Sequence, residues 1–395
     1  MLAVPSPPFT LLNAHIVNAD GVMLGNLRIE RGRIAALNAP LQRGDVALDL
    51  EGAFLYPGLI NAHDHLELNN FPRLKWRERY ANAHEWIADF QPRFQTDPAL
   101  TGPLSASLAD RLFIGGIKNL LSGVTTVCHH NPLHRSLRRA DFPVRVMQRY
   151  RWSHSLMIDD KDQVARAYRR TPRGWPWIIH AAEGTDAEAA GELDRLERLG
   201  CLGSNTVLVH GVGLRESDRA KLLERGGGLI WCPASNHFTL GTTAEVRDLA
   251  RAGRVALGSD SRLSGARDLL EELKYAAQTG QVDARALFRM VTVEAAALLR
   301  LTEAGRLAPG LPADAFALPR LADDAYQTLL MAERRDVRLV MVGGRPILGA
   351  PELAPGHIKT QCLTVEGEPK WLERKLARRL RACSIREPGV VTQDD

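Results

Sequence analysis

The chain lacks any long apolar run. No window of about 18 residues is both apolar and free of charge, so we expect no membrane-spanning helix. Met1–Pro5 contains no basic residue and no long apolar stretch follows it, so we expect no secretory signal and a cytoplasmic protein. Cysteine is also scarce. The five cysteines form no CxxC pair, which is typical of free thiols in a reducing compartment.

The chain has no strong excess of either charge. Its 51 Lys and Arg against 46 Asp and Glu give a net charge of +5, with basic clusters at 73–79, at 135–139 and near the C-terminus. No nucleic-acid-binding motif accompanies the clusters, so we expect no nucleic-acid partner. Two alternatives remain for them, an ordinary solvated surface and a basic rim that attracts an anionic substrate. At 395 residues with 45% apolar content, the chain can form one large domain and one small one.

The most informative motif is His63-Asp64-His65, which follows the apolar run 54–62. Residues i and i+2 of a strand face the same side, so both imidazoles can bind one metal ion. Such a pair alone is a weak signal, because many are ordinary surface residues. Its interpretation depends on whether further ligands occur elsewhere in the chain.

Three later segments repeat the pattern of a short apolar run that ends in a polar residue, namely 177–180 with His180, 206–210 with His210 and 255–260 with Asp260. Each run is predicted to be a buried parallel strand. Active sites of βα barrels lie at the carboxyl ends of the strands. Taken singly, each histidine could be a core or loop residue and the Gly-Ser-Asp a turn. Together, the four strand ends predict a zinc or ferrous site made of histidines and one aspartate, with open positions for water.

A family resemblance rests on seven motifs in a fixed order: LYPGLINAHDH (55–65), GVTTV (123–127), HAAEG (180–184), LVHGVGL (208–214), WCPASNHFTLG (231–241), LGSDSRLSG (257–265) and GRLAPGLPADA (305–315). With these motifs the chain resembles the amidohydrolase superfamily, in its cytosine deaminase and chlorohydrolase-like branch, over about residues 9–350. The ordered set is specific for the superfamily and uninformative about the substrate.

We expect the metal ligands to be His63, His65, His180 and Asp260. A bound divalent ion makes its water acidic near neutral pH, and Asp260 can take the proton from that water. In the resembled branch, a glutamate at the position of Glu183 protonates the substrate and the leaving nitrogen. Without the resemblance, Glu183 would be interpreted as an acidic residue at a helix N-terminus. The resemblance gives His210 the role of orienting or polarising the attacked group.

The resemblance also bears on the number of metal ions. Two-metal relatives use a carboxylated lysine on a middle strand of the barrel. The lysines between His65 and His180 are Lys75, Lys118 and Lys161, and none falls inside a predicted strand. We therefore expect one divalent ion, Zn or Fe(II).

The predicted fold is α/β, with a (β/α)8-type TIM barrel over residues 59–309. The resemblance implies a small β-sandwich domain built from residues 1–58 and 310–350. Residues 351–395 are predicted to be a C-terminal extension, with a basic amphipathic helix over about 371–380 that packs onto the barrel or binds a membrane surface or partner. Seven strand ends are clear, so the barrel is distorted or lacks one βα unit. Trp152–Met157 is a candidate eighth strand, but the gap before it is too short for a crossover helix.

Substrate contacts are expected from two places. The long aromatic connection from Glu67 to about Leu104 is predicted to be a folded lid that supplies Trp76 and Trp86. The second strand is followed by His129 and His130, which are interpreted as substrate contacts or as members of a hydrogen-bonded loop. Asn236, in a turn that resembles a family PxSN turn, is expected to be structural or pocket-lining.

The predicted function is that of a metal-dependent hydrolase that uses a metal-activated water to attack an sp2 carbon. Deamination of a ring amine or amidine of a small heterocycle is preferred. Hydrolysis of a cyclic amide, as in imidazolonepropionase-like relatives, is the alternative, and a non-catalytic binding protein on the same fold is the third hypothesis. The expected partner is a small-molecule substrate. An anionic substrate and a homo-oligomer are open alternatives.

Overall fold

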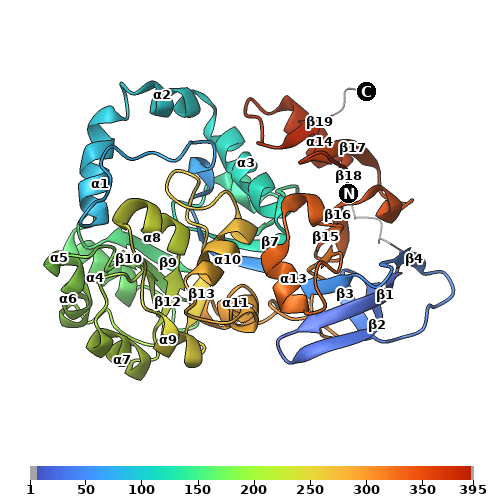
Figure 1. Cartoon of the computed structure of the whole chain (residues 1–395), viewed down its shortest axis with the longest axis horizontal. Helices are drawn as coiled ribbons and strands as arrows, with labels where there is room; N and C mark the ends of the chain where they lie inside the picture. The colour runs from blue at the N-terminus through green and yellow to red at the C-terminus, as the bar shows by residue number, and fades with distance from the viewer. Residues whose placement is uncertain (1–6, 393–395) are drawn as a thin grey trace.

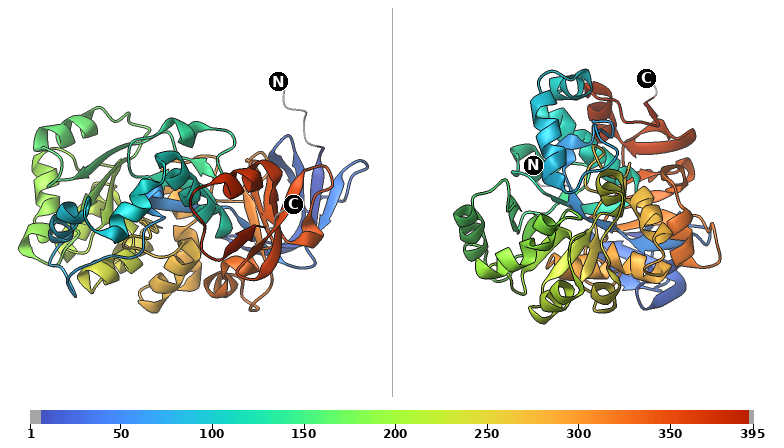
Figure 2. Two further views of the ribbon diagram at one scale, coloured as in Figure 1. Left: turned by 90° about the horizontal axis from the view of Figure 1, so that it is seen from above. Right: turned by 60° about the vertical axis from the view of Figure 1, so that its left-hand side comes forward.

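The computed structural model describes residues 7–392, which form an α/β half beside a large, mainly antiparallel sheet (Figure 1). Met1–Pro5, from which no secretory signal was expected, lies outside the described residues. Within them, no helix is long and apolar enough to cross a membrane. In Figure 2, the α/β half and the large sheet lie at opposite ends of the molecule.

Eight parallel strands form the α/β half, in two sheets. The first sheet contains β6 (Leu59–Asp64), β7 (Val124–His129) and β8 (Arg145–Val146), and the second contains β9 (Arg151–Ser155), β10 (Trp177–Ala181), β11 (Thr206–His210), β12 (Gly228–Trp231) and β13 (Val255–Leu257). The sheets meet at one edge, where the backbone N–H of Asp260 donates to His63 O and the N–H of His65 donates to Asp260 O, both at 3.0 Å. The carboxyl ends of the outermost strands are thereby brought together.

At the other edge, β8 and β9 are separate. Only residues 147–150 connect them, and within residues 7–392 neither a crossover helix nor a β8–β9 pairing is present. The prediction of an α/β chain with parallel strands is confirmed, but the structure does not show a closed barrel. The candidate eighth strand, Trp152–Met157, corresponds to β9 and is reached without a helix.

Helices surround these strands, mostly on their outer side. They are α3 (Leu108–Leu121), α4 (Lys161–Arg169), α5 (Ala187–Ala190), α6 (Glu192–Arg198), α7 (Glu216–Glu224), α8 (Pro233–Leu240), α9 (Arg247–Arg251), α10 (Leu269–Gln278), α11 (Ala284–Met290) and α12 (Val293–Leu298). Strand residues alternate between two cores. Trp177 and Ile179 belong to the cluster that includes helix side chains such as Leu193, whereas Ile178 and Val207 belong to an inner cluster. Because both faces are buried, the strands are continuous apolar runs.

The large sheet has eleven strands among the described residues and contains segments from both ends of the chain. Its members are β1 (Phe9–Asn18), β2 (Gly21–Glu30), β3 (Arg33–Leu37), β4 (Val46–Asp49), β5 (Phe54–Pro57), β14 (Ala315–Leu318), β15 (Leu339–Val342), β16 (Arg345–Gly349), β17 (Thr360–Val365), β18 (Glu368–Glu373) and β19 (Val390–Thr392). A further helix, α13 (Ala325–Met331), lies between β14 and β15. The sheet also includes strands from residues 351–392, and the division into a sandwich, a barrel and an extension stays a prediction.

The predicted helix over 371–380 is corrected at its start. Trp371 is on β18, paired with Cys362 and Gly349, and helix α14 covers Arg374–Ala382. The absence of a side chain at Gly349 makes room for the indole, because a Cβ there would lie 2.8 Å from a ring carbon of Trp371. Helix α14 then packs against α3, with the Arg379 guanidinium 4.1 Å from the centre of the Phe113 ring.

Candidate metal centre and active-site cavity

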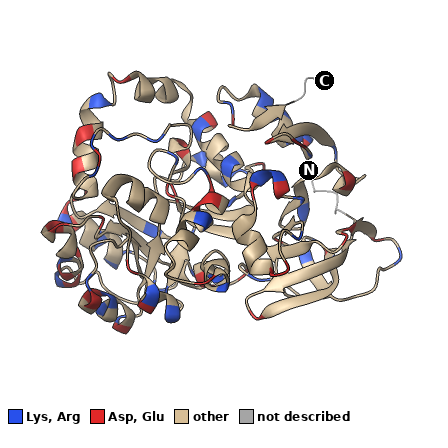
Figure 3. Cartoon of the chain, viewed as in Figure 1, with Lys and Arg blue, Asp and Glu red and all other residues tan. Residues whose placement is uncertain are grey.

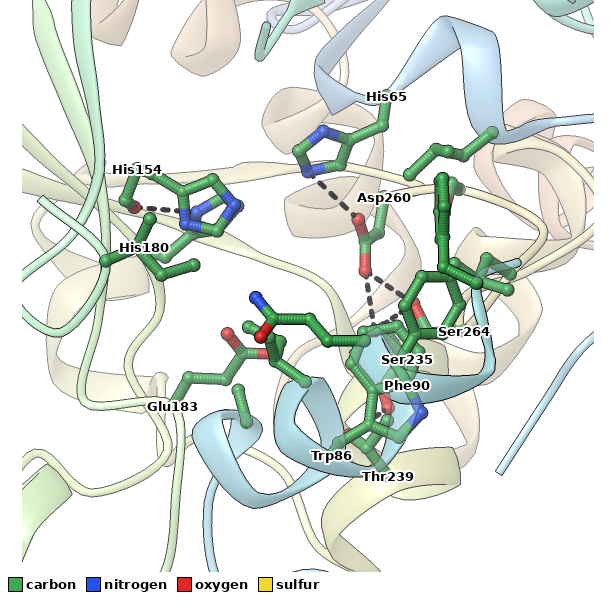
Figure 4. A pocket seen from close by; sticks show the side chains of 18 of the residues that line it. His65, Trp86, Phe90, His154, His180, Glu183, Ser235, Thr239, Asp260 and Ser264 are labelled. Atoms are coloured by element: carbon green, nitrogen blue, oxygen red, sulfur yellow. Dashed lines mark hydrogen bonds and ion pairs between the residues drawn. The ribbon is translucent and has the colours of Figure 1, made fainter. Parts of the chain in front are cut away.

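Four predicted ligands converge where β6, β10 and β13 end, and Figure 4 shows three of them, His65, His180 and Asp260. His63 Nε2 lies 3.2 Å from His180 Nε2 and 3.6 Å from Asp260 Oδ1, and His65 Nε2 is also 3.6 Å from Asp260 Oδ1. Ligand atoms at about 2.1 Å from a tetrahedral zinc ion are about 3.4 Å apart. The separations therefore fit one divalent ion, and all four side chains are buried.

The protonation of His180 also suits a metal ligand. Its Nδ1 lies 2.8 Å from the carbonyl oxygen of His154 and must donate to it, so the neutral ring has a lone pair on Nε2. Burial lowers the pKa of His180 well below its ordinary value, and the neighbouring histidines lower it further. A neutral ring with a free Nε2 is the form that binds a cation.

Asp260 is held in place by two hydroxyl groups. Ser235 Oγ and Ser264 Oγ donate to its Oδ2 at 2.7 and 2.8 Å, which leaves Oδ1 facing the histidines. Burial by itself would raise the pKa of Asp260, but its contact with His63 and the nearby imidazoles of His65 and His210 hold it well below its ordinary value. The backbone φ of Asp260 is +54°, a left-handed conformation that costs free energy in a residue other than glycine. The hydrogen bonds around its side chain and backbone hold it there.

Beneath the metal ligands lies a buried polar cluster centred on Asp64. Lys118 Nζ, on α3, donates to Asp64 Oδ2 at 3.2 Å, to Asn69 Oδ1 at 2.7 Å and to Ser259 Oγ at 3.0 Å. Because side chains alternate along a strand, Asp64 faces away from His63 and His65. The cluster ties the end of β6 to α3 and to the residue before Asp260. The Lys118 ammonium thus makes three hydrogen bonds. Nothing in the sequence indicated that Lys118 would hold Asp64 in place.

Glu183 follows β10 and lies opposite Asp260 in the cavity (Figure 4). Its Oε1 is 3.4 Å from His210 Nε2. Burial raises the pKa of Glu183 well above its ordinary value, and the charges of Asp260 and Glu192 act in the same direction. Glu183 therefore holds a proton to higher pH than a solvent-exposed glutamate.

The tautomer of His210 is set by a chain of hydrogen bonds. The indole N–H of Trp231 donates to Thr243 Oγ1 at 2.7 Å, the Thr243 hydroxyl donates to Asn236 Oδ1 at 3.2 Å, and Asn236 Nδ2 donates to His210 Nδ1 at 2.9 Å. The indole nitrogen can only donate, and because the Thr243 hydroxyl donates to Asn236 Oδ1, the amide N–H of Asn236 faces His210. The proton of neutral His210 is consequently on Nε2, the nitrogen that faces Glu183.

This protonation gives His210 a different role from that of the candidate metal ligands. A nitrogen of His210 lies within 4.8 Å of nitrogens of His63 and His180, so distance alone would allow a ligand role. The protonated Nε2 instead makes His210 a hydrogen-bond donor to the cavity. Burial lowers the pKa of His210 to about 3, so the ring is neutral at physiological pH. Asn236, expected to be structural or pocket-lining, positions His210 and is not among the residues that line the cavity.

Three predicted substrate contacts lie away from the cavity. The His130 ring stacks on His180 with centroids 4.3 Å apart, and its Nε2 donates to a backbone carbonyl. His129 is buried behind the first turn after β6, where the backbone N–H of Leu66 donates to its Nδ1 at 3.3 Å. Trp76 packs against Phe90 with centroids 6.1 Å apart. These three side chains support the walls rather than line them.

The cavity above the metal ligands has a volume of about 780 Å³. Its outer wall is formed by the lid, which folds into α1 (Ala83–Phe90), the short helix η2 (Gln91–Arg93) and α2 (Pro98–Ser105). The predicted contact Trp86 lines it, together with apolar side chains from the lid and from the loop after β9, namely Ile87, Phe90, Phe94 and Ile158. Among the described residues, no lysine or arginine lines this cavity.

Comparisons with known proteins find similar enzymes. A profile of the Amidohydrolase family matches residues 177–347. The chain is 27% identical to a 5'-deoxyadenosine deaminase of Methanothermobacter thermautotrophicus, over 86% of this chain and 92% of the relative. It is 29% identical to a 5-methylthioadenosine/S-adenosylhomocysteine deaminase of Natronomonas pharaonis, over 81% of this chain and 86% of the relative. The chain is thus similar to the amidohydrolase superfamily over most of its length.

Solved structures show the same fold. An adenosine deaminase from Xanthomonas campestris with bound zinc has a TM-score of 0.71 at 19% identity, covering 88% of this chain and 94% of that protein. An atrazine chlorohydrolase from Arthrobacter aurescens, also with zinc, has a TM-score of 0.70 at 18% identity, covering 89% and 97%. The family model and both deaminase relatives indicate a hydrolase that acts on non-peptide carbon–nitrogen bonds.

Proposed function

We propose that this protein uses one divalent ion to deaminate a small amino-substituted heterocycle that bears an uncharged, apolar substituent. The observation that carries the proposal is the set of three groups around the cavity floor: Asp260 beside the metal ligands, Glu183 with its raised pKa opposite, and His210 presenting an N–H between them. A base, an acid and a hydrogen-bond donor are what hydrolysis at an amidine-like ring carbon requires.

Each group has one task in this reaction. A divalent ion, when bound, supplies a water acidic enough to lose a proton near neutral pH. Asp260 accepts that proton at its carboxylate. Glu183 donates its own proton to the ring nitrogen, which makes the ring carbon more electrophilic, and the oxygen of the deprotonated water forms a bond to that carbon. The amino group then takes up the proton held by Asp260, its bond to the carbon breaks, and it leaves as ammonia. His210 Nε2–H donates a hydrogen bond to the attacked position and holds the substrate in line.

The walls of the cavity favour an uncharged substrate. Trp86 and Phe90 offer flat apolar surface to a ring, with ring centroids 5.4 Å apart. The basic residues that could have attracted an anion are engaged elsewhere. Lys75 Nζ donates to the carbonyl oxygens of Glu78 and Phe238, and Arg73 Nε donates to Gly265 O. Neither side chain lines the cavity, so the geometry supports an uncharged substituent over an anionic one.

The names of the relatives point to aminopurine nucleosides. 5'-Deoxyadenosine carries an uncharged group at its 5' position, whereas S-adenosylhomocysteine carries a charged amino acid there. Because no lysine or arginine of the described chain lines the cavity, we propose that compounds of the first kind are the better substrates.

The test is an activity screen on metal-loaded protein over 5'-deoxyadenosine, S-adenosylhomocysteine and cyclic amides, with ammonia and new carboxylate both measured. We expect ammonia from 5'-deoxyadenosine and a kcat/KM at least tenfold lower for the charged compound, since an unpaired buried charge is costly. The protein should contain about one divalent ion per chain, and His180→Ala should lose most of it. New carboxylate without ammonia would instead support the cyclic amidase, and no turnover with an intact metal site would favour a binding protein.

A further inference from the structure

The segment between the candidate metal ligands of β6 and β10 has a larger net positive charge than the whole chain. Residues 131–175 contain eleven Lys and Arg and four Asp, a net charge of +7, whereas the whole chain has +5. The rest of the protein is therefore slightly acidic. The segment forms the open edge of the α/β half, where β8 and β9 are separate and no crossover helix is present in the described residues.

A second cavity opens at this edge, with a volume of about 580 Å³. It is distinct from the active-site cavity and has no lining residue in common with it. Four arginines line it, from the short helix η3 (Arg135–Arg138), from β9 and from α4 and its C-terminal cap: Arg138, Arg151, Arg166 and Arg170. No carboxylate is among its lining residues in the described chain.

These arginines differ from others on the surface in lacking acidic partners. On α6 and α7, positive and negative residues are interspersed (Figure 3), and Arg225 there pairs with Glu197 at 3.1 Å. Within residues 7–392, no ion pair involves Arg138, Arg151 or Arg170, and Arg166 Nε donates to a backbone carbonyl at 3.2 Å. Like charges around one cavity repel each other, and a bound anion would remove that repulsion.

The inner wall of the cavity is aromatic. Tyr150 is buried and its hydroxyl donates to the carbonyl oxygen of His129, and Trp152 is half-buried with its ring 5.2 Å from the His130 ring. A flat aromatic wall beside four guanidinium groups suits a ligand that has both a planar ring and several negatively charged oxygens. His130 in turn stacks on His180, so a ligand here would lie directly behind the metal centre.

We propose that the cavity lined by the four arginines is a binding site for a compound with two or more linked phosphate groups, either inorganic or as part of a nucleotide. Planar guanidinium groups bind phosphate oxygens through paired hydrogen bonds, and several such groups around one cavity match several linked phosphates. The volume of the cavity accommodates a small molecule. The site takes no part in the hydrolysis, and it stands whether or not the proposed substrate is right.

The test is titration calorimetry of the metal-loaded protein with inorganic triphosphate and with uridine triphosphate, with metal content measured before and after. We expect 1:1 binding that weakens as salt rises. Arg138→Gln combined with Arg170→Gln should lower the affinity by about tenfold or more, since each removes a charge-assisted hydrogen bond. Tighter binding of the nucleotide than of triphosphate would identify the aromatic wall as part of the site, and equal binding would identify the phosphates alone as the ligand.

The matched control is Arg225→Gln combined with Arg251→Gln, which removes the same charge from exposed arginines that pair with Glu197 and Asp248. This control should bind triphosphate as the parent protein does. An equal loss in both double variants would overturn the proposal, because the binding would then be a general charge effect. A single-stranded oligouridylate that binds while triphosphate does not would also overturn it, in favour of a nucleic-acid surface.

Discussion

In the proposed reaction, Glu183 acts as an acid because of its surroundings rather than its residue type. Burial and the nearby carboxylates raise its pKa, so it keeps the proton that the leaving amine needs. Glu183→Gln retains the shape but has no acidic proton, and we expect kcat to fall by about 10²–10⁴-fold while metal content is unchanged. Glu188→Gln, an exposed neighbour on α5 that pairs with Arg195, should leave both unchanged. Normal turnover by Glu183→Gln would remove the acid role.

His210 depends in the same way on a neighbour that touches no substrate. Asn236→Asp replaces an N–H donor with an acceptor, so the proton of His210 should move to Nδ1 and leave Nε2 unprotonated. We expect kcat to fall by about 10–100-fold, the usual cost of losing an orienting partner. ¹⁵N spectra of histidine-labelled zinc protein would report the tautomer change directly.

Thr243 provides the matched pair of controls for this chain of hydrogen bonds. Thr243→Ser keeps the hydroxyl that donates to Asn236 and should keep both the tautomer and the activity. Thr243→Val lacks that hydroxyl and should weaken the preference of the His210 proton for Nε2. An unchanged His210 spectrum in Asn236→Asp would show that the chain does not set the tautomer.

At the scale of elements, the lid and the catalytic loop form one unit. The backbone N–H of Ala83 donates to Glu183 O at 2.9 Å, and the N–H of Thr185 donates to Ala81 O at 2.7 Å. Gly184 permits this approach, because a Cβ there would lie 2.6 Å from Asn82 Cβ. The start of α1 therefore determines where Glu183 lies.

Gly184→Ala should force the lid and the loop apart. We expect a higher KM and a lower kcat with full metal content, and a loss of about 1–3 kcal/mol in stability from the overpacking. Gly102→Ala is the control, since a Cβ at that position of α2 meets nothing within 4 Å. Kinetics of both variants on one substrate would compare them, and equal kinetics in the two would contradict the coupling of lid and loop.

At the scale of the whole molecule, a buried ionic cluster ties the end of the chain to the active-site half. Glu387 pairs with Arg262 at 2.5 Å and with Arg334 at 2.7 Å, and Arg334 also pairs with Asp268 at 2.5 Å. Arg262 follows β13, next to residues that line the cavity. The C-terminal segment thus supports a loop of the active site.

This cluster predicts how stability depends on pH. Burial would raise the pKa of Glu387, but Arg262 and Arg334 outweigh it and lower the pKa below its ordinary value of 4.5. A lowered folded-state pKa means that the contribution to stability is complete above about 4.5 and is lost as pH falls through the folded-state pKa. We expect acid to destabilise the protein in that range, measured as the free energy of unfolding in urea at several pH values.

Glu387→Gln should remove part of that pH dependence and cost about 3–5 kcal/mol at neutral pH, because it leaves buried arginines without a full counter-charge. Glu368→Gln, exposed on β18, is the control and should have little effect. A Glu387→Gln protein as stable as its parent would show that the cluster contributes nothing net.

Much of the site could be predicted from the sequence because its ligands are local features of strand ends. His63, His65, His180 and Asp260 each close an apolar run, and parallel strands necessarily place such residues at one edge. The residues that hold the site residues in position could not be found in this way. Lys118 appears as one charge in a helix and Asn236 as one amide in a turn, and only the packing of α3 and α8 against the strands brings them to Asp64 and His210.

The sequence by itself determined the alternation of strands and helices, the candidate metal ligands and the resemblance to the amidohydrolase superfamily, because periodicity and motif spacing are local features of the chain. The tertiary structure decided what depends on contacts between distant segments. It placed Trp371 in a strand because Gly349 makes room for the indole. It also placed Trp76, His129 and His130 outside the cavity lining, because other side chains of the lid and of the α/β half lie in front of them. It also left β8 and β9 unpaired, which opened the arginine-lined cavity that charge patterning alone could not locate.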